Sequence, residues 1–204
     1  MKYLRLFVLI LISAVLAGCA SNRPNLLPVD SPPKIIVQNG FSFMPLNESE
    51  WYIIERQPYE VSLAKRGAAT DETFAIQGKV FQFPTFASNE AFMQAVKQGQ
   101  ANDTDPANPG RYVTLTHDIE LYEHRGETCA YSHIVTEDHA AKKRTSTPGF
   151  MILDVYALIC RHPQNQNAAI SFNYSQRNYA QNLDKTLESK ARRLIESLEF
   201  TALQ

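Results

Sequence analysis

The sequence has little excess charge of either sign. Its 204 residues carry 20 Lys and Arg against 21 Asp and Glu, a formal net charge of −1. Removal of residues 1–18, which contain Lys2 and Arg5 and no acidic residue, leaves 18 basic against 21 acidic residues, a net charge of −3. Domains that bind nucleic acid are typically strongly basic. The composition therefore predicts no nucleic-acid partner.

The common catalytic motifs are also missing. There is no H-E-x-x-H, no G-x-S-x-G, no P-loop and no G-x-G-x-x-G in the sequence. His117 falls on the apolar side of a predicted strand, which favours a hydrogen-bonded core residue over a metal ligand. We therefore expect no catalytic residue, no metal ligand and no cofactor. The alternative is an enzyme, hydrolytic or metal-dependent, whose unrecognised site uses His117, His133 or Asp118.

The sequence also lacks an apolar run long enough to span a bilayer. The longest, Leu6–Leu16, has 11 residues and is interrupted by Ser13, whereas a transmembrane helix needs about 20. Two basic residues precede this run, and the small residues Ala17 and Gly18 follow it. A basic start, a short apolar core and small residues at the end are typical of a secretory signal peptide.

The end of this segment, Leu16-Ala17-Gly18-Cys19, resembles the lipobox of bacterial lipoproteins. The resemblance covers residues 1–20. It implies that residues 1–18 are cleaved and that Cys19 carries a diacylglyceryl thioether and an acylated amino terminus. Two or more acyl chains anchor a protein stably, whereas a single chain is marginal. The sequence after Cys19, Ala20-Ser21 without Asp, is similar to the outer-membrane sorting pattern. The alternative is an ordinary signal peptide with a chance cysteine near the cut.

Residues 19–40 are rich in Pro and Asn, which predicts a flexible tether between Cys19 and a single globular domain over residues 41–204. Fully extended, such a tether would reach roughly 70 Å. Ile35-Ile36-Val37 interrupts it. This apolar triplet is either an edge strand that docks on the domain or a partner-binding segment.

Two cysteines, Cys129 and Cys160, remain besides Cys19. The signal peptide directs the chain to an oxidising compartment, where an even number of cysteines predicts a disulfide. If residues 128–136 and 151–161 are antiparallel neighbours, the bridge sets a register in which His133 lies opposite Tyr156. The alternative, a redox-active pair, lacks the C-x-x-C spacing.

Apolar alternation predicts a sheet of sequential strands. Ser88 is predicted to cap a short middle helix over 89–99, and an apolar stripe predicts an amphipathic C-terminal helix over 182–198. Gly78 is a candidate β-bulge. The fold class expected is α+β, a mainly antiparallel sheet with the C-terminal helix packed on it. The strands are predicted at 51–56, 59–64, 73–83, 112–124, 128–136, 151–161 and 168–177.

Lys142, Lys143 and Arg144 form the one basic run, in a polar loop over 137–150. This loop is either solvated and mobile, or it contacts lipid head groups or an acidic partner. The 20 Tyr and Phe residues fall mostly in strand patterns and are either core or the lining of a concave sheet surface.

The strands followed by an amphipathic helix and Ser197-Leu198-Glu199-Phe200 are similar to envelope and thylakoid-lumen domains of the PsbP/Mog1 type. That resemblance implies an α+β fold and a non-catalytic assembly or binding role. We therefore expect a lipid-anchored envelope protein, at the outer membrane and facing the periplasm. Its expected partners are the membrane, through Cys19, and another envelope protein or an apolar ligand.

Overall fold

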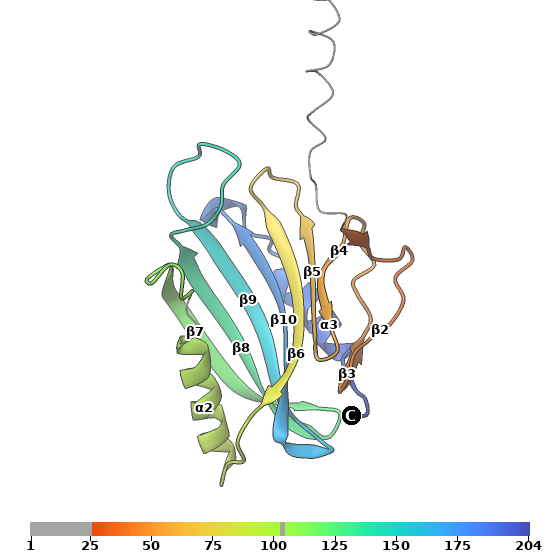
Figure 1. The fold of residues 1–204 in the computed structure, drawn as a ribbon. Coiled ribbons are helices and arrows are strands. Elements are labelled where there is room, and N and C mark those ends of the chain that lie inside the picture. Colours follow the sequence, from red (N-terminus) through yellow and green to blue (C-terminus); the bar gives the residue numbers. More distant parts are fainter. Residues whose placement is uncertain (1–25, 103–104) are drawn as a thin grey trace, which may run out of the picture.

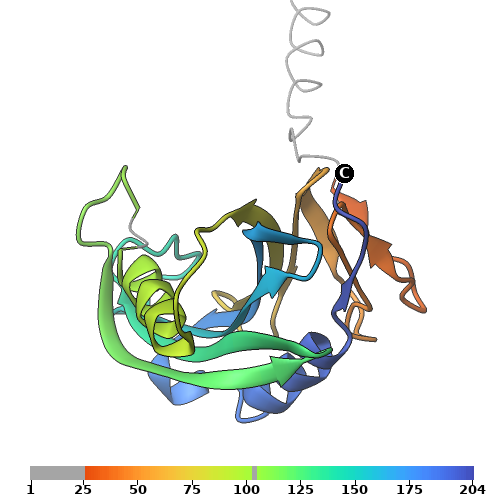
Figure 2. The ribbon, with the colours of Figure 1, turned by 90° about the horizontal axis from the view of Figure 1, so that it is seen from below.

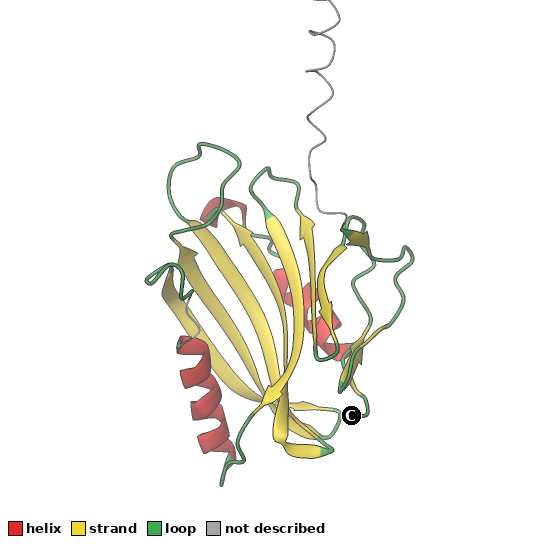
Figure 3. Ribbon diagram, viewed as in Figure 1, coloured by secondary structure: helices red, strands yellow, loops and turns green. Residues whose placement is uncertain are grey.

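Runs of aromatic and β-branched residues form one large antiparallel sheet (Figure 1 and Figure 3). The computed structural model describes residues 26–102 and 105–204. The strand order is β1-β4-β5-β6-β10-β9-β8-β7, and every pairing is antiparallel. The strands are β1 (Leu27–Pro28), β4 (Tyr52–Gln57), β5 (Glu60–Arg66), β6 (Thr73–Gln82), β7 (Tyr112–His124), β8 (Glu127–Asp138), β9 (Met151–His162) and β10 (Asn165–Asn178).

A second sheet of three short strands, in the order β11-β3-β2, packs beside the first. Over the residues that the structure describes, the helices are the middle helix α2, the 3-10 helix η1 and the C-terminal helix α3. The predicted α+β class is thus confirmed. The bounds are β2 (Ile36–Val37), β3 (Phe41–Phe43), α2 (Asn89–Ala101), η1 (Ala180–Asn182), α3 (Leu187–Glu196) and β11 (Glu199–Phe200).

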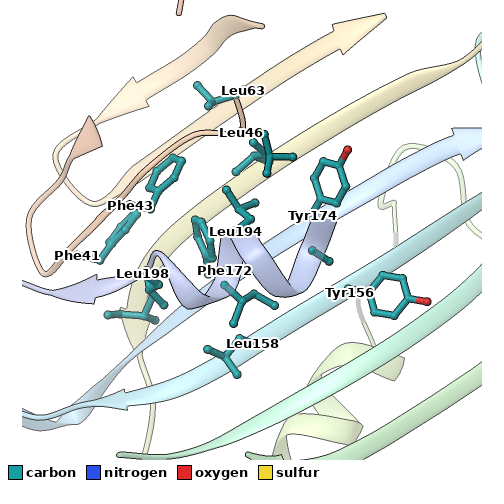
Figure 4. Packing of buried hydrophobic residues seen from close by; sticks show 14 of the residues in the cluster. Phe41, Phe43, Leu46, Leu63, Tyr156, Leu158, Phe172, Tyr174, Leu194 and Leu198 are labelled. Atoms are coloured by element: carbon teal, nitrogen blue, oxygen red, sulfur yellow. The ribbon is translucent and has the colours of Figure 1, made fainter. Parts of the chain in front are cut away.

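The large sheet has two differently covered faces. Helix α3 packs on β9 and β10, and α2 packs on β7 and β8 from the other side (Figure 2). The main core lies on the α3 face, where Phe41, Phe43 and Phe172 meet α3 residues such as Leu194 (Figure 4). A smaller apolar cluster around Phe92 and Val96 fixes α2. Because α2 covers only one end of its face, the rest of that face is open to a groove.

The ordered domain begins earlier than residue 41. Pro28 pairs with Tyr52 through β1, and Ile36 pairs with Phe43 through β2 and is buried. Ile35-Ile36-Val37 thus takes the predicted edge-strand alternative, and residues 27–40 are not the free tether expected. Strands of two residues give little signal in a sequence, because their stability comes from the neighbours with which they pair.

The apolar residues of strand β7 do not share one buried side. A bulge between Thr114 and Thr116 reverses the alternation, and β7 has a neighbour on one side only in the described sheet. Val113, Leu115 and Leu121 consequently stay 43–52% exposed. At the C-terminus the predicted helix 182–198 is shortened to Leu187–Glu196. The Ser88 cap of α2 is confirmed, since its hydroxyl accepts a hydrogen bond from the Ala91 amide at 3.2 Å.

Gly78 forms no bulge, because its pairings with Val61 and Phe172 are continuous. Its lack of a side chain instead admits the ring of Phe41. A Cβ at this position would lie 2.6 Å from Phe41 Cε2 and 3.1 Å from Phe172 Cδ2. Both rings are fully buried.

We therefore expect Gly78→Ala to lower the free energy of unfolding by about 1–3 kcal/mol, the usual cost of overpacking a core, in urea titration. The matched control is Gly99→Ala in α2, where an added Cβ meets nothing within 4 Å. This control should stabilise the domain by roughly 0.5–1 kcal/mol through helix propensity. Equal stability of Gly78→Ala and the wild type would contradict the packing described.

Candidate functional site

The open part of the α2 face forms a groove of about 530 Å³. It crosses the sheet between the C-terminal end of α2 and strand β6, over β8, β9 and β10. Its lining is Ala75, Gln77, Gln100, Ala101, Asp105, Gly110, Arg111, Tyr112, Thr114, His117, Ile134, Thr136, Leu153, Val155, Ala157, Ile159, Ser171, Asn173, Ser175 and Arg177. We refer to this surface as the groove.

Strand register divides the groove floor into an apolar and a polar half. Ile134 on β8 pairs with Val155 on β9, and both side chains are partly exposed. On the next two strands, Asn173 pairs with Gln77. The side chains of Asn173, Gln77, Ser171 and Ser175 make no hydrogen bond to another described residue. The polar half thus presents free amide and hydroxyl groups, which both donate and accept.

A buried ionic cluster closes one end of the groove. The Asp138 carboxylate is fully buried and accepts two hydrogen bonds from Arg111, Nε to Oδ1 at 2.7 Å and Nη2 to Oδ2 at 2.8 Å. Arg177 Nε lies 2.9 Å from Asp138 Oδ2. Arg111 Nη1 also donates to Asp105 at 2.9 Å. Two carboxylates and two guanidinium groups therefore balance one another here.

The arginines control the ionisation of Asp138. Burial raises the pKa of its carboxyl, but the hydrogen bonds from Arg111 and the charge of Arg177 outweigh it, and the pKa lies below its ordinary value. Asp138 is thus an anion at neutral pH, and its charge is already satisfied. These residues build the end of the groove, and none of them is free to act as a general acid or base.

A neutral network closes the other end. His117 Nε2 lies 2.9 Å from Gln100 Oε1, and the Gln100 amide donates to Ser132 Oγ at 2.7 Å. Burial and the nearby charge of Lys97 lower the pKa of His117. The predicted hydrogen bonding of His117 is confirmed, although its ring remains partly exposed.

The other predicted histidine, His133, lies on the opposite face. Its Nε2 is 2.8 Å from Asp154 Oδ1, and its ring stacks on Tyr156 with centroids 4.2 Å apart. Burial raises the pKa of Asp154, more than the hydrogen bond from His133 lowers it. Asp118 pairs with His133 across the strands and shares its small pocket of about 250 Å³. The sheet therefore separates His117 from His133 and Asp118.

The remaining histidines are not among the residues that line the groove. His124 and His162 contact backbone carbonyl groups, and His139 lies 2.9 Å from Glu137. Over residues 26–102 and 105–204, no group of three or more His, Cys, Asp or Glu residues could hold a metal ion.

The disulfide Cys129–Cys160 is present between β8 and β9. The predicted register is confirmed, since Cys129 pairs with Cys160 and His133 with Tyr156. Both cysteines are fully buried under the α3 face. Cys19 and the lipobox lie outside the described residues. Within those residues, no helix combines the length and the apolar character needed to cross a membrane.

The basic loop between β8 and β9 is held in place rather than free. The buried carboxylate of Asp71 accepts hydrogen bonds from the backbone amides of Arg144 and Thr145, the Thr145 hydroxyl and the Tyr179 hydroxyl. The bond from Thr145 is the main reason that the pKa of Asp71 lies below its ordinary value. All three basic residues are exposed, and Lys143 donates to the Thr147 carbonyl at 3.1 Å.

Sequence reasoning missed Arg111, Asp138, Arg177 and Asp71. Arg111 and Arg177 are 66 positions apart in the chain and meet only because β7, β8, β9 and β10 are neighbours. A charged residue next to a predicted strand end is common, so no local pattern identifies these four.

The fold and the groove define an α+β domain with one open sheet face. No protein-family model and no curated protein matches the chain. A similar solved structure is the solution structure of cyanobacterial PsbP (CyanoP) from Synechocystis sp. PCC 6803, at 13% identity and a TM-score of 0.39, over 91% of this chain and 99% of that one. This structure belongs to the PsbP type, the same type that the strand pattern resembles. At this TM-score the likeness carries no argument on function.

Proposed function

We propose that the chain is a lipid-anchored lipoprotein of the cell envelope, at the outer membrane and facing the periplasm. Its domain binds another envelope protein in the groove and catalyses no reaction. The anchor rests on the lipobox around Cys19. The groove, with its two closed ends and its unpaired polar groups, is the observation that carries the binding role.

The lining favours a protein segment over a purely apolar ligand. The apolar side chains of an extended segment could pack on Ile134 and Val155, while its backbone groups could form hydrogen bonds with Asn173 and Gln77. An apolar ligand would bury those amides without hydrogen bonds, which costs free energy. The aromatic residues that could hold an apolar ligand lie mostly elsewhere, since Tyr112 is the one aromatic residue in the lining.

The alternative, an envelope enzyme, has one observation in its favour. His133, which bonds to Asp154, lines the small pocket on the α3 face together with Glu188 and Arg192. A histidine oriented by a carboxylate is a common general base. An enzyme of this kind would bind its substrate on the α3 face, whereas the binding module would hold its partner in the groove on the opposite face. The two proposals are therefore distinguished by the face on which the ligand binds.

The test is photo-crosslinking in intact cells. A photoreactive amino acid at Val155 or Asn173, both in the groove, should give one discrete crosslinked protein partner. The matched position is Ser189, which is exposed on α3 and should give none.

Mass spectrometry of the purified protein should show a mature chain that begins at Cys19 with its lipid. Crosslinks from Ser189 alone would contradict the groove as the binding site, and an unmodified Cys19 would contradict the anchor.

A further inference from the structure

We propose that the loop between β8 and β9, residues 139–150, rests on the anionic surface of the membrane that holds the lipid anchor. The inference deepens the proposed function and rests on its lipid anchor at Cys19. The occupant of this surface is thus a layer of lipid head groups, rather than an acidic protein.

The first argument is the length of the chain before the domain. Leu27 already pairs with Ile53, so residues 20–26 alone separate the domain from Cys19. Seven residues span at most about 25 Å. The 14 residues of β10 extend over about 46 Å. The tether is therefore shorter than the sheet, and it holds the domain against the membrane instead of displaying it at a distance.

The second argument is the place of the loop. In Figure 1 the loop from β8 to β9, the turn from β5 to β6 and strand β1 all lie in the upper part of the domain, whereas the C-terminus lies at the lower end. Strand β1 is the described element nearest to Cys19 in the sequence. A membrane reached by a short tether from β1 lies within reach of the upper loops.

The third argument is the chemistry of the loop. Lys142 and Arg144 are exposed, and Phe150 at the end of the same loop is 50% exposed, with one side of its ring stacked on His139. The carboxylates next to the basic run are occupied, because Asp71 holds the loop backbone and Glu137 pairs with His139. Basic residues bind anionic head groups, and aromatic rings settle at head-group level.

The fourth argument is preorganisation. Three hydrogen bonds from Arg144 and Thr145 to Asp71 fix the backbone there, and Tyr179 holds Asp71 with a fourth. Within the loop, Lys143 donates to the carbonyls of Thr147 and Gly149. A loop fixed before binding loses less entropy when it meets a surface. The proposed membrane contact thus gives a reason for the hydrogen bonds that fix this exposed basic loop.

The experiment uses the full lipidated protein in vesicles and tryptophan quenching by brominated lipids. Trp51 is the one tryptophan of the chain and is 2% exposed, so the wild type should not be quenched. In Phe150→Trp, brominated lipids should roughly halve the fluorescence of the new tryptophan in vesicles that contain phosphatidylglycerol, because its ring settles at head-group level. Lys142→Ala/Arg144→Ala in the same background should abolish the quenching, with an unchanged thermal midpoint.

The outcomes separate the two proposals. Flotation of the protein with vesicles, but without quenching of Phe150→Trp, would overturn the loop contact and leave the anchor intact. Equal quenching in purely zwitterionic vesicles would overturn the electrostatic contact. A third outcome would assign the loop to an acidic protein instead of the membrane. In that case Phe150→Trp would show no quenching, and a protein crosslink seen in cells with the wild type would be lost in Lys142→Ala/Arg144→Ala. Failure to float would refute the anchor itself.

Discussion

Replacement of both disulfide cysteines, Cys129→Ala/Cys160→Ala, is expected to lower the free energy of unfolding by about 3–4 kcal/mol. The bridge closes a loop with a sequence separation of 31, and the chain-entropy model assigns a loop of this size about that amount. Domains are generally stable by only about 5–15 kcal/mol. The variant should therefore fold, with a clearly lower urea midpoint.

The bridge acts mainly on the unfolded chain. Cys129 and Cys160 are already opposite each other in the β8–β9 ladder, which continues from Ala130–Ile159 to Asp138–Met151. The far-UV circular dichroism of the variant should thus match that of the wild type. The control is wild-type protein that is reduced in denaturant and then refolded. If the bridge acts mainly by restricting the unfolded chain, the free energy of unfolding of this control should lie within about 1 kcal/mol of that of the variant. Two free thiols in the exported protein would rule the bridge out.

The cysteine pair also shows what a sequence can predict. A covalent link between two strands removes the freedom to slide, so residue numbers alone give the partner of His133. Ser88 is similar, since a helix cap depends on its own neighbours in sequence. The sheet class followed from alternation that extends over many residues.

Features that depend on distant contacts were out of reach. Gly78 looked like a bulge because nothing near it in sequence reveals the ring of Phe41 above it. The exposure of Val113 depends on the bulge after Thr114, which alternation cannot locate. The groove itself depends on how much of a sheet face α2 leaves uncovered, which is a property of packing. The polar groups that line it resemble ordinary exposed strand residues in the sequence.

Replacement of the buried carboxylate, Asp138→Asn, is expected to lower the free energy of unfolding by about 2–4 kcal/mol at neutral pH. Loss of one partner of a buried ion pair typically costs about 3–5 kcal/mol, because the other charge stays buried and unpaired. The cost should be somewhat lower here, since the side chains of Arg111 and Arg177 keep 20% and 28% exposure. The exposed Asp118→Asn on β7 is the matched control and should change stability by less than about 0.5 kcal/mol.

The pH dependence gives this prediction a second, independent measurement. The folded-state pKa of Asp138 lies below its ordinary value. The contribution of Asp138 is thus fully present above the unfolded pKa of about 3.9, and it is lost as the pH falls through the folded pKa. Urea titrations at stepped pH should show the difference between wild type and Asp138→Asn shrinking below about pH 4. A difference that stays constant down to pH 2, or a variant as stable as the wild type, would mean that Asp138 does not hold Arg111 and Arg177 together.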